Sequence, residues 1–487
     1  MSLTKKIAYN TFIQVAGKVV STVLGLFALA LMTRYLGQTG FGQYTTIITF
    51  VSFFAIIADL GLTLVTVQMI STIKDETSRI VNNLLSLRLV SILFFLGLAP
   101  LISFFFPYDN LIKLGIIIAA ISFIFPALNQ ILVGLFQKNL KMEAVSLSEI
   151  LSRIILVGGI YLVIFRDSGI NGILWATVAS AAGSFLVLYL FSKRFVKIKF
   201  QIDLSIWKQI IKKTWPLAIT IVFNLLYLKA DILILSIFKD QSAVGLYGAA
   251  YKIIDVLTTI PFIFAGIILP ILSADWANKN QEHFNKILQK AFDVMVICAI
   301  PLVIGTQFLA EPIMHFVAGD DFNAAGLILK ILIVAIAAIF MGCLFAHAVI
   351  AIDKQKQVIG AYIFTGLSSL LAYLFFIYHY SYIGAAAVTV YSEVIIASFS
   401  IYYVWRYSRF LPKLKMFFRS LFSALIMGLI LYFCPTNWLN SIPGLLSVGA
   451  GAVAIYLILV FVFGGFTKDD LSLIFGDKPR RHLTPYN

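Results

Sequence analysis

The stretch LLYLKADILIL, from Leu225 to Leu235, places two charged side chains inside an otherwise apolar run. Lys229 and Asp231 lie midway along a segment, 215–238, that is long enough to cross a bilayer. A charge near the bilayer centre costs roughly 2.5–3.5 kcal/mol on insertion scales. Residues two apart on a helix point about 200° away from each other, so these two charges cannot neutralise one another. Each therefore needs a separate partner or a wet cavity.

The composition of the whole chain is that of a polytopic membrane protein. Of its 487 residues, 61% are hydrophobic and only 12% are charged, and the mean hydropathy is +0.97. Soluble domains are nearer one half apolar and one quarter charged. The three cysteines lie in apolar runs at no metal-ligand spacing, so we expect no metal site. We expect the first helix to be retained as an insertion signal, because no small-residue cleavage site follows it.

Apolar runs of membrane-spanning length recur along the entire sequence and predict an all-α protein with fourteen transmembrane helices. An even number of spans places both termini on one side of the membrane. The predicted spans are 9–32, 43–70, 84–106, 112–136, 144–165, 172–192, 215–238, 244–272, 291–309, 325–350, 358–378, 383–404, 418–434 and 443–463.

The distribution of Lys and Arg orients these spans. With cytoplasmic termini, 27 of the 37 basic residues fall in cytoplasmic segments and only four fall on the opposite side. Short loops with this bias set membrane orientation, so we predict a plasma (inner) membrane protein with both ends in the cytoplasm. The net charge of +15 is spread over alternate loops instead of one face, which argues against a nucleic-acid partner.

Short internal repeats divide the chain into two halves. Gly42 and Tyr44 of GFGQY recur as Gly245 and Tyr247 of AVGLY, at an offset of 203 residues. Similarly, GILWATV from Gly172 recurs as GAAAVTV from Gly384, six spans later. Halves that are six spans apart share one orientation, so we predict two pseudo-symmetric six-helix lobes around a central cavity, with two additional C-terminal helices.

The predicted spans and the repeat together divide the chain into five parts. Between the two lobes lies an amphipathic segment, DLSIWKQIIKKTW, which is typical of a helix on an anionic membrane surface. The alternative for this segment is a solvated basic loop. The parts are an N-terminal lobe (1–195), a cytoplasmic linker (196–214), a C-terminal lobe (215–407), transmembrane helices 13 and 14 (408–465) and a cytoplasmic tail (466–487).

Several charged side chains lie inside the predicted spans, where such residues usually face a bundle interior or a watery cavity. Lys18, Arg153, Lys229 and Lys252 are candidate substrate-binding residues, because a cavity with ammonium and guanidinium groups suits a phosphate-bearing headgroup. The candidate residues for cation coupling or charge pairing are Glu149, Asp231, Asp255 and Glu393.

Structural ion pairs are the alternative reading of the same charges. Glu149 precedes Arg153 by four residues and Lys252 precedes Asp255 by three, so each pair could neutralise itself on one helix face. Arg88 lies near the end of its span and is expected to extend its side chain toward the interface. Asn129, Gln130 and Asn224 could bond sugar hydroxyls or join neighbouring helices.

Two longer motifs carry a resemblance to a known family. The segment RYLGQTGFGQY (34–44) followed by DLGL (59–62) resembles the opening of Wzx-type polysaccharide and O-antigen flippases. The segment YLKADILIL…AVGLYGAAYKIIDVL (227–257) resembles the start of that family's second half, with Lys229 where the family often has Arg. The signature positions are Arg34, Gly42, Tyr44, Asp59, Gly245 and Tyr247.

This resemblance implies membership of the multidrug/oligosaccharidyl-lipid/polysaccharide exporter superfamily. It implies a flippase that turns undecaprenyl-diphosphate-linked oligosaccharide from the cytoplasmic to the outer leaflet by alternating access. The implied partners are that lipid-linked glycan, the membrane lipid and glycan-assembly proteins such as a polymerase or a chain-length regulator. No cofactor is expected, and coupling to H⁺ or Na⁺ is left open.

Other functions remain alternatives at this point. A multidrug exporter of the same superfamily would favour an acidic or aromatic cavity, whereas six basic residues lie in the predicted spans. A glycan polymerase or ligase would need a large outer loop with catalytic groups, and no such loop or enzyme motif is recognised, so we predict a protein that is not an enzyme. A structural membrane partner would not need charges that face a cavity.

Overall fold

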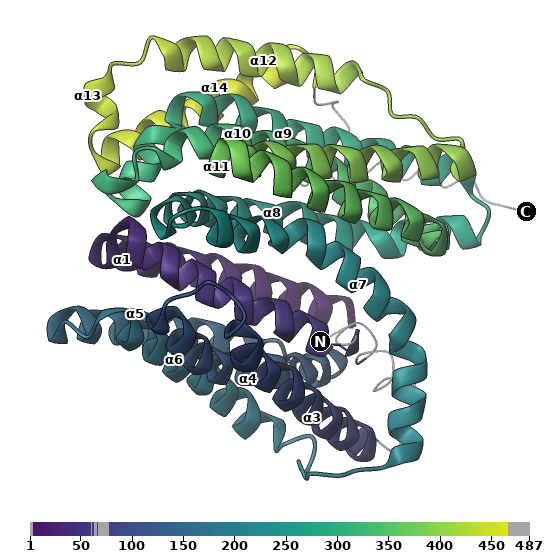
Figure 1. Ribbon diagram of the computed structural model, residues 1–487. Helices are drawn as coiled ribbons and strands as arrows, with labels where there is room; N and C mark the ends of the chain where they lie inside the picture. The colour runs from purple at the N-terminus through teal and green to yellow at the C-terminus, as the bar shows by residue number, and fades with distance from the viewer. Residues whose placement is uncertain (1–2, 60, 63–65, 67–76, 466–487) are drawn as a thin grey trace, which may run out of the picture. The chain divides into compact units, whose positions relative to one another are not determined.

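The computed structural model describes residues 3–59, 61–62, 66 and 77–465, and helices with short connections account for them (Figure 1). Apolar runs of this length become helices in lipid because a helix satisfies its own backbone hydrogen bonds. The long helices are α1 (Leu3–Asp59), α3 (Thr77–Ser103), α4 (Asn110–Lys138), α5 (Glu143–Arg166), α6 (Gly169–Ser192), α7 (Leu204–Phe238), α8 (Gln241–Ala277), α9 (Gln281–Ala318), α10 (Ala325–Ala351), α11 (Gln355–Ser408), α12 (Lys415–Tyr432) and α14 (Ile442–Val462). Two short elements complete the described chain, α13 (Thr436–Leu439) and η1 (Asp320–Phe322).

All fourteen predicted spans correspond to these helices, although the end of the second span lies outside the described residues. Among the described residues, eleven helices are long and apolar enough to cross a membrane, and the span predicted at 215–238 lies in α7. Two helices each contain two predicted spans. Gly37 (φ 64°, ψ −176°) breaks α1 between spans one and two, and Ser381 (φ 53°, ψ −136°) breaks α11 between spans eleven and twelve. The positive φ at Gly37 is readily adopted only by glycine.

The structure divides into two compact units whose boundaries differ from the predicted lobes. The first unit comprises residues 1–256, 314–332 and 356–396, and the second comprises 257–313, 333–355 and 397 onward. In the first unit, α1 packs against α3, α4 and α5, and α6 packs against both α4 and α5 (Figure 1). In the second unit, α12 packs against α14, and Tyr456 donates a hydrogen bond to the carbonyl of Ile297 (2.9 Å).

Residues 196–203, between α6 and α7, form an extended segment that is hydrogen bonded to α3. We call this segment the strap. Side chains of Asn82, Ser86 and Asn83 accept hydrogen bonds from the backbone amides of Lys199 (3.1 Å), Gln201 (2.9 Å) and Asp203 (2.8 Å), respectively. These bonds satisfy backbone groups that have no secondary structure of their own. The strap therefore follows the course of α3.

Asp203 joins this strap to the start of α7. Its carboxylate accepts from the amides of Ser205 (3.0 Å) and Ile206 (3.3 Å), as an N-cap residue does. It also pairs with Arg79 at 2.5 Å. The hydrogen bond from Arg79 is the main reason that the pKa of Asp203 lies below its usual value, and the amide of Ile206 lowers it further. The stabilisation from this group is therefore present above the usual aspartate pKa and is lost as the pH falls through the lowered value.

The predicted amphipathic helix proves to be the first part of α7 and not a separate element. The apolar residues of this segment do not share one environment. Ile210 is fully buried and Trp207 packs on the core of α3, α4 and α6, whereas Leu204 and Ile211 are exposed. The sequence pattern could not separate residues that face the protein from those that face the membrane, because both environments are apolar.

We expect Asp203→Ala to loosen the strap, because it removes the cap of α7 and the contact with Arg79. Limited trypsin digestion at Lys197 and Lys199 should then be severalfold faster than in the wild type. Asp240→Ala is the matched control, because Asp240 accepts from the amide of Ala243 (3.1 Å) at the start of α8. Equal cleavage rates in the wild type and Asp203→Ala would show that Asp203 does not hold the strap.

Candidate functional site

A polar cavity of about 530 Å³ lies within the first unit, among α1, α4, α5 and α6. Its charged lining residues are Lys18, Glu149 and Arg153, all of which were predicted from the sequence as site residues. Its other polar lining residues are Ser21, Tyr44, Asn129, Gln130, Gln137, Ser148, Ser152, Thr177, Ser180 and Ser184. We call this space the polar cavity.

Close helix packing brings the charged face of α5 to the polar cavity. A Cβ atom on Gly17 of α1 would lie 2.7 Å from the Cβ of Ser146 on α5. A Cβ on Gly159 of α5 would lie 2.8 Å from that of Ala176 on α6. These small residues let the three helices approach closely, as is common in membrane proteins. Glu149 and Arg153 lie one turn apart on α5 between the two contacts, so both side chains reach the cavity.

The charges of the polar cavity are not neutralised by ion pairs. Within the described part of the chain, Lys18, Glu149 and Arg153 have no ion-pair partner within 4.0 Å. The local pair of Glu149 with Arg153, which the sequence left as an alternative, is therefore not formed. The guanidinium of Arg153 lies beside α1, where a Cβ on Gly25 would be 3.7 Å from its Cζ. Two cations and one anion give the cavity an excess of positive charge.

Uncharged polar groups add hydrogen-bonding capacity. The side-chain amide of Asn129 donates to Ser184 (3.2 Å), and its Oδ1 atom is buried without a hydrogen-bond partner in the described structure. Ser152 and Ser180 are joined at 2.8 Å. Gln130 accepts from Arg88 (2.5 Å). The side chain of Asn224, the third predicted polar residue, lies outside the described part of the chain.

Asp231 belongs to a different site, a buried cluster in the second half of the chain. Its side chain is fully buried, and Oδ2 accepts from the hydroxyl of Tyr247 (2.7 Å). Oδ1 accepts from the amide of Ile232 (2.7 Å). The hydroxyl of Thr389 lies 3.1 Å from the hydroxyls of both Tyr247 and Tyr373. We call Asp231, Tyr247, Tyr373 and Thr389 the tyrosine cluster; it joins α7, α8 and α11.

Lys229 and Lys252 lie near this cluster and do not line the polar cavity. The ammonium of Lys229 lies 5.1 Å from the ring centroid of Tyr251, which is within the range of a cation–π contact. Lys252 and Asp255 form the predicted local ion pair at 3.6 Å, and both side chains are about half exposed. The four predicted basic site residues thus fall into two groups, Lys18 with Arg153 and Lys229 with Lys252.

Glu393, on α11, is the remaining predicted carboxylate in the second half. Its side chain is buried, and it has no hydrogen bond or ion pair with any residue in the described ranges. A buried charge without a partner is costly, and a proton or a bound cation would remove that cost. Glu393 therefore differs from Asp231, whose two oxygens both accept hydrogen bonds.

Arg88 is the clearest correction to the sequence prediction. It is 2% exposed instead of extended toward the membrane surface, and its guanidinium pairs with Asp59 at 2.6 Å. It also donates to the carbonyls of Ala58 and Ala127 (both 3.3 Å). The position of Arg88 along its own helix could not predict this ion pair. The sequence did contain one indication of it, because Asp59 is a charged residue in a neighbouring predicted span and needs a cationic partner there.

The repeated motifs meet each other in the structure. A Cβ on Gly42 would lie 1.7 Å from the carbonyl oxygen of Gln241, and one on Gly245 would lie 2.0 Å from that of Gln38. Gln38 and Gln241 are themselves 203 residues apart, as are the two glycines. The contact is therefore reciprocal, and α1 and α8 touch backbone to backbone where each motif begins. We call it the glycine crossing.

Side chains around the glycine crossing reinforce it. Thr46 donates to the side chain of Gln241 (2.8 Å), and Ser242 donates to the side chain of Gln38. The amide of Gln38 also donates to the carbonyl of Asp321. Nearby, Arg34 donates to the carbonyls of Phe316 (2.8 Å) and His315 (3.3 Å). The signature residues Arg34, Gly42 and Gly245 thus hold together segments from both halves at the predicted outer end.

The internal repeat extends to side-chain contacts. Tyr44 and Thr177 both line the polar cavity, and Tyr247 is hydrogen bonded to Thr389 (3.1 Å), so equivalent tyrosines and threonines of the two halves lie in corresponding places. Each threonine also donates to the carbonyl four residues earlier, both at 3.0 Å. The tyrosine and the threonine therefore occupy corresponding positions in the two halves, but their surroundings differ. In the first half they line the polar cavity, and in the second half they belong to the tyrosine cluster.

Curated relatives of the chain are distant in sequence. A probable low-salt glycan biosynthesis flippase of Haloferax volcanii is 24% identical over 160 residues, which are 33% of this chain and 34% of that protein. The alignment thus spans about a third of the archaeal relative. A capsular polysaccharide biosynthesis protein of Staphylococcus aureus is 21% identical over 276 residues, 56% of this chain and 69% of the relative.

Solved structures show the same fold over nearly the whole length. The lipid II flippase MurJ, in an inward closed conformation, has a TM-score of 0.73 at 18% identity and covers 96% of this chain and 99% of its own. An inward-facing multidrug resistance transporter of the MATE family and MOP superfamily has a TM-score of 0.62 at 14% identity, covering 81% and 94%. Together with the eleven membrane-length apolar helices among the described residues, this likeness identifies a multi-pass membrane protein with a transporter fold.

Family models match both halves of the chain. The MatE model matches residues 216–375, and the model for polysaccharide biosynthesis proteins matches residues 7–276, more than half of the sequence. The larger match contains Lys18, Arg153 and the glycine crossing. The chain therefore belongs to the polysaccharide biosynthesis protein family.

Proposed function

We propose that this protein is a flippase that carries an undecaprenyl-diphosphate-linked oligosaccharide from the cytoplasmic to the outer leaflet of the plasma membrane. The observation that carries the proposal is the polar cavity, in which Lys18 and Arg153 have no ion-pair partner in the described structure. Family membership and the flippase named among the relatives agree with it. The transport cycle breaks no covalent bond, so the protein acts as a carrier and not as an enzyme.

The chemistry of the polar cavity fits the polar end of such a lipid. Ammonium and guanidinium groups both form strong, charge-assisted hydrogen bonds with phosphate oxygens. The amide of Asn129 and the hydroxyls of Ser152 and Ser180 can exchange their present hydrogen bonds for bonds to sugar hydroxyls. The prenyl chain can remain in the bilayer, since it is as apolar as the lipid around it.

The glycine crossing supplies a closed outer gate in this proposal. In alternating access, two halves of a carrier move against each other around a site near the midplane. Backbone contact between Gly42 and Gly245 closes the predicted outer end, and separation of α1 from α8 at this point would open it. We assign both termini to the cytoplasm on the charge distribution of the loops.

We assign the coupling of transport to an ion gradient to the carboxylates inside the predicted spans. Glu149 lies at the polar cavity, whereas Asp231, Asp255 and Glu393 lie on α7, α8 and α11 in the second half. A proton or Na⁺ bound by one of them would couple transport to an ion gradient. The membrane potential contributes roughly 2.3 kcal/mol per charge per 100 mV. Glu393 is the foremost candidate, because the described structure gives it no partner.

A multidrug exporter is the competing function, and the MatE match to residues 216–375 favours it. The excess positive charge of the polar cavity disfavours cationic drugs. The proposal is tested by deleting the gene in its native host and analysing the lipid fraction by mass spectrometry. We expect an undecaprenyl-diphosphate-linked glycan to accumulate and surface glycan to be lost. Unchanged glycan lipids, with increased drug sensitivity instead, would establish the exporter.

We expect Lys229→Ala to abolish glycan export while the protein inserts at wild-type levels, because the variant removes the cation on Tyr251 beside the tyrosine cluster. Surface glycan and membrane protein level are measured together. Lys239→Ala is the matched control. Lys239 lies near the other end of α7, 5.9 Å from the ring centroid of Tyr378, and its removal should leave export intact. Wild-type display with Lys229→Ala would remove Lys229 from the mechanism.

A further inference from the structure

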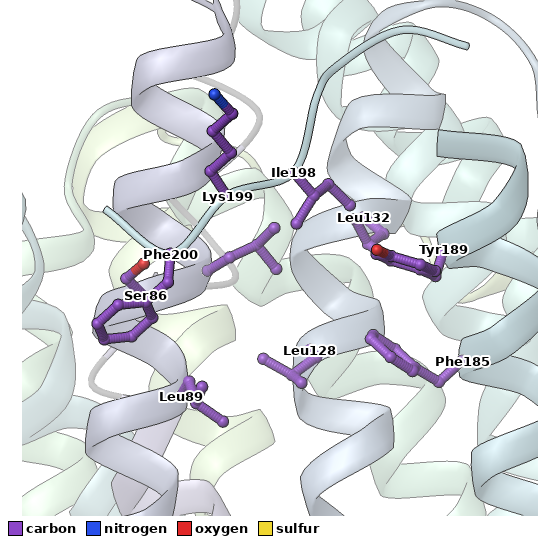
Figure 2. Close-up of a pocket in the computed structure, with 10 residues that line it drawn as sticks. Ser86, Leu89, Leu128, Leu132, Phe185, Tyr189, Ile198, Lys199 and Phe200 are labelled. Carbon is purple, nitrogen blue, oxygen red and sulfur yellow. The ribbon is translucent and has the colours of Figure 1, made fainter. Parts of the chain in front are cut away.

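A second cavity, of about 160 Å³, lies apart from the polar cavity and is almost entirely apolar. It is lined by residues of α3, α4, α6 and the strap (Figure 2). Leu89, Leu128 and Phe185 lie at one end of it in Figure 2, and the strap residues Ile198 and Lys199 lie at the other. We call it the strap pocket.

The interior of the strap pocket is almost entirely apolar, and the hydroxyl of Tyr189 is the further polar group in its lining besides Ser86 and Lys199. Ser86 is the only serine in its lining, and its hydroxyl already accepts the amide hydrogen of Gln201 (2.9 Å). The remaining interior consists of leucine, isoleucine and aromatic side chains. An apolar cavity of about 150 Å³ in a protein stays dry and binds a benzene-sized group. A short segment of hydrocarbon chain is therefore the ligand that the interior suits.

Two ammonium groups lie at the pocket lining, one on Lys199 and one against the ring of Tyr189. Lys199 is part of its lining, and Figure 2 shows its ammonium pointing away from Leu89, Leu128 and Phe185. The ammonium of Lys193 lies 4.7 Å from the ring centroid of Tyr189, another lining residue. Among the residues that the structure describes, neither lysine has a carboxylate within ion-pair distance. The pocket lining thus presents positive charge that is not neutralised.

We propose that the strap pocket binds a segment of one acyl chain of an anionic phospholipid of the bilayer, with the phosphate held by Lys199 and Lys193. The apolar interior and the cationic mouth match the two parts of such a lipid. Basic pockets between membrane helices on the cytoplasmic side are suited to anionic headgroups, and the strap lies on the predicted cytoplasmic side. The bound lipid stabilises the strap against α3, and so the connection between the two halves of the chain.

Native mass spectrometry of the purified, delipidated full-length protein tests this proposal. The protein is titrated with dimyristoyl phosphatidylglycerol and, separately, with dimyristoyl phosphatidylcholine. Leu128→Trp fills the interior of the pocket, and Leu114→Trp, at an exposed position of the same helix, is its control. Lys199→Ala removes the charge at the mouth. Lys197→Ala is its control, because this strap lysine does not line the pocket and uses only its carbonyl to bind Asn82 (3.2 Å).

We expect one phosphatidylglycerol to be retained in preference to phosphatidylcholine. Leu128→Trp should abolish this retention, Lys199→Ala should weaken it severalfold, and both controls should behave as the wild type. Equal binding of the two phospholipids, or equal effects of Lys199→Ala and Lys197→Ala, would overturn the proposal. Displacement of phosphatidylglycerol by undecaprenyl phosphate would overturn it too, since the pocket would then serve the prenyl lipid. Lys199→Ala changes an exposed side chain, so the test does not depend on the folding of Leu128→Trp.

Discussion

Gly42→Ala should stop glycan export, and Gly245→Ala should do so to the same degree. In each variant the added methyl would lie 2.0 Å or less from a backbone carbonyl oxygen of the opposing segment. A rigid backbone cannot give way as a side chain can, so α1 and α8 must separate. If closing the predicted outer end is an obligatory step, we expect surface glycan to fall at least tenfold, which corresponds to about 1.4 kcal/mol lost from the closed state.

A disulfide reporter separates this effect from misfolding. Cysteines at Thr45 and Gly248, where a Cβ on Gly248 would lie 3.2 Å from the Cβ of Thr45, should crosslink readily in a background without the native cysteines. We expect the crosslink to be lost when Gly42→Ala is added. Gly97→Ala is the control, because a Cβ there meets nothing within 4 Å. Normal export and normal crosslinking in Gly42→Ala would show that the glycine crossing is not a gate.

Arg153→Ala should be the most damaging substitution in the polar cavity, followed by Lys18→Ala. A hydrogen bond to a charged group contributes about 1.5–3 kcal/mol, which corresponds to roughly 10- to 150-fold in binding of the headgroup. Arg153→Lys should recover only part of this loss, because an ammonium keeps the charge but not the planar pair of donors. The measurement is the amount of lipid-linked glycan on the cytoplasmic face at equal protein level.

The matched control for Arg153→Ala is Arg166→Ala, which removes an arginine at the end of the same helix and outside the cavity lining. We expect that variant to export normally. If Arg153→Ala exported as well as Arg166→Ala, the positive charge of the polar cavity would have no part in transport.

The sequence predicted the helices and the repeat well, because both depend on local information. Hydrophobic length alone located the spans, and the motifs around Gly42 and Gly245 correctly indicated two related halves. The pair Lys252–Asp255 was also accessible, since spacing along one helix determines which side chains can meet.

Contacts between helices could not be predicted in the same way. Arg88 pairs with Asp59 across two spans, and Lys229 lies on Tyr251 instead of beside Lys18 and Arg153. The four-residue spacing of Glu149 and Arg153 also allowed an ion pair between them. Instead, both side chains line the polar cavity, and neither has an ion-pair partner in the described structure. These outcomes depend on how helices pack, which the order of residues along one helix does not determine.

Photocrosslinking inside living cells tests the central claim, that the polar cavity receives the charged headgroup. A photoreactive phenylalanine analogue replaces Ser184, which lines the cavity, or Leu186, which is exposed two residues later on α6. The account predicts that Ser184 captures the lipid-linked glycan, that Leu186 does not, and that adding Lys18→Ala and Arg153→Ala abolishes the capture. Capture that is equal at both positions, or that persists without the two cations, would contradict it.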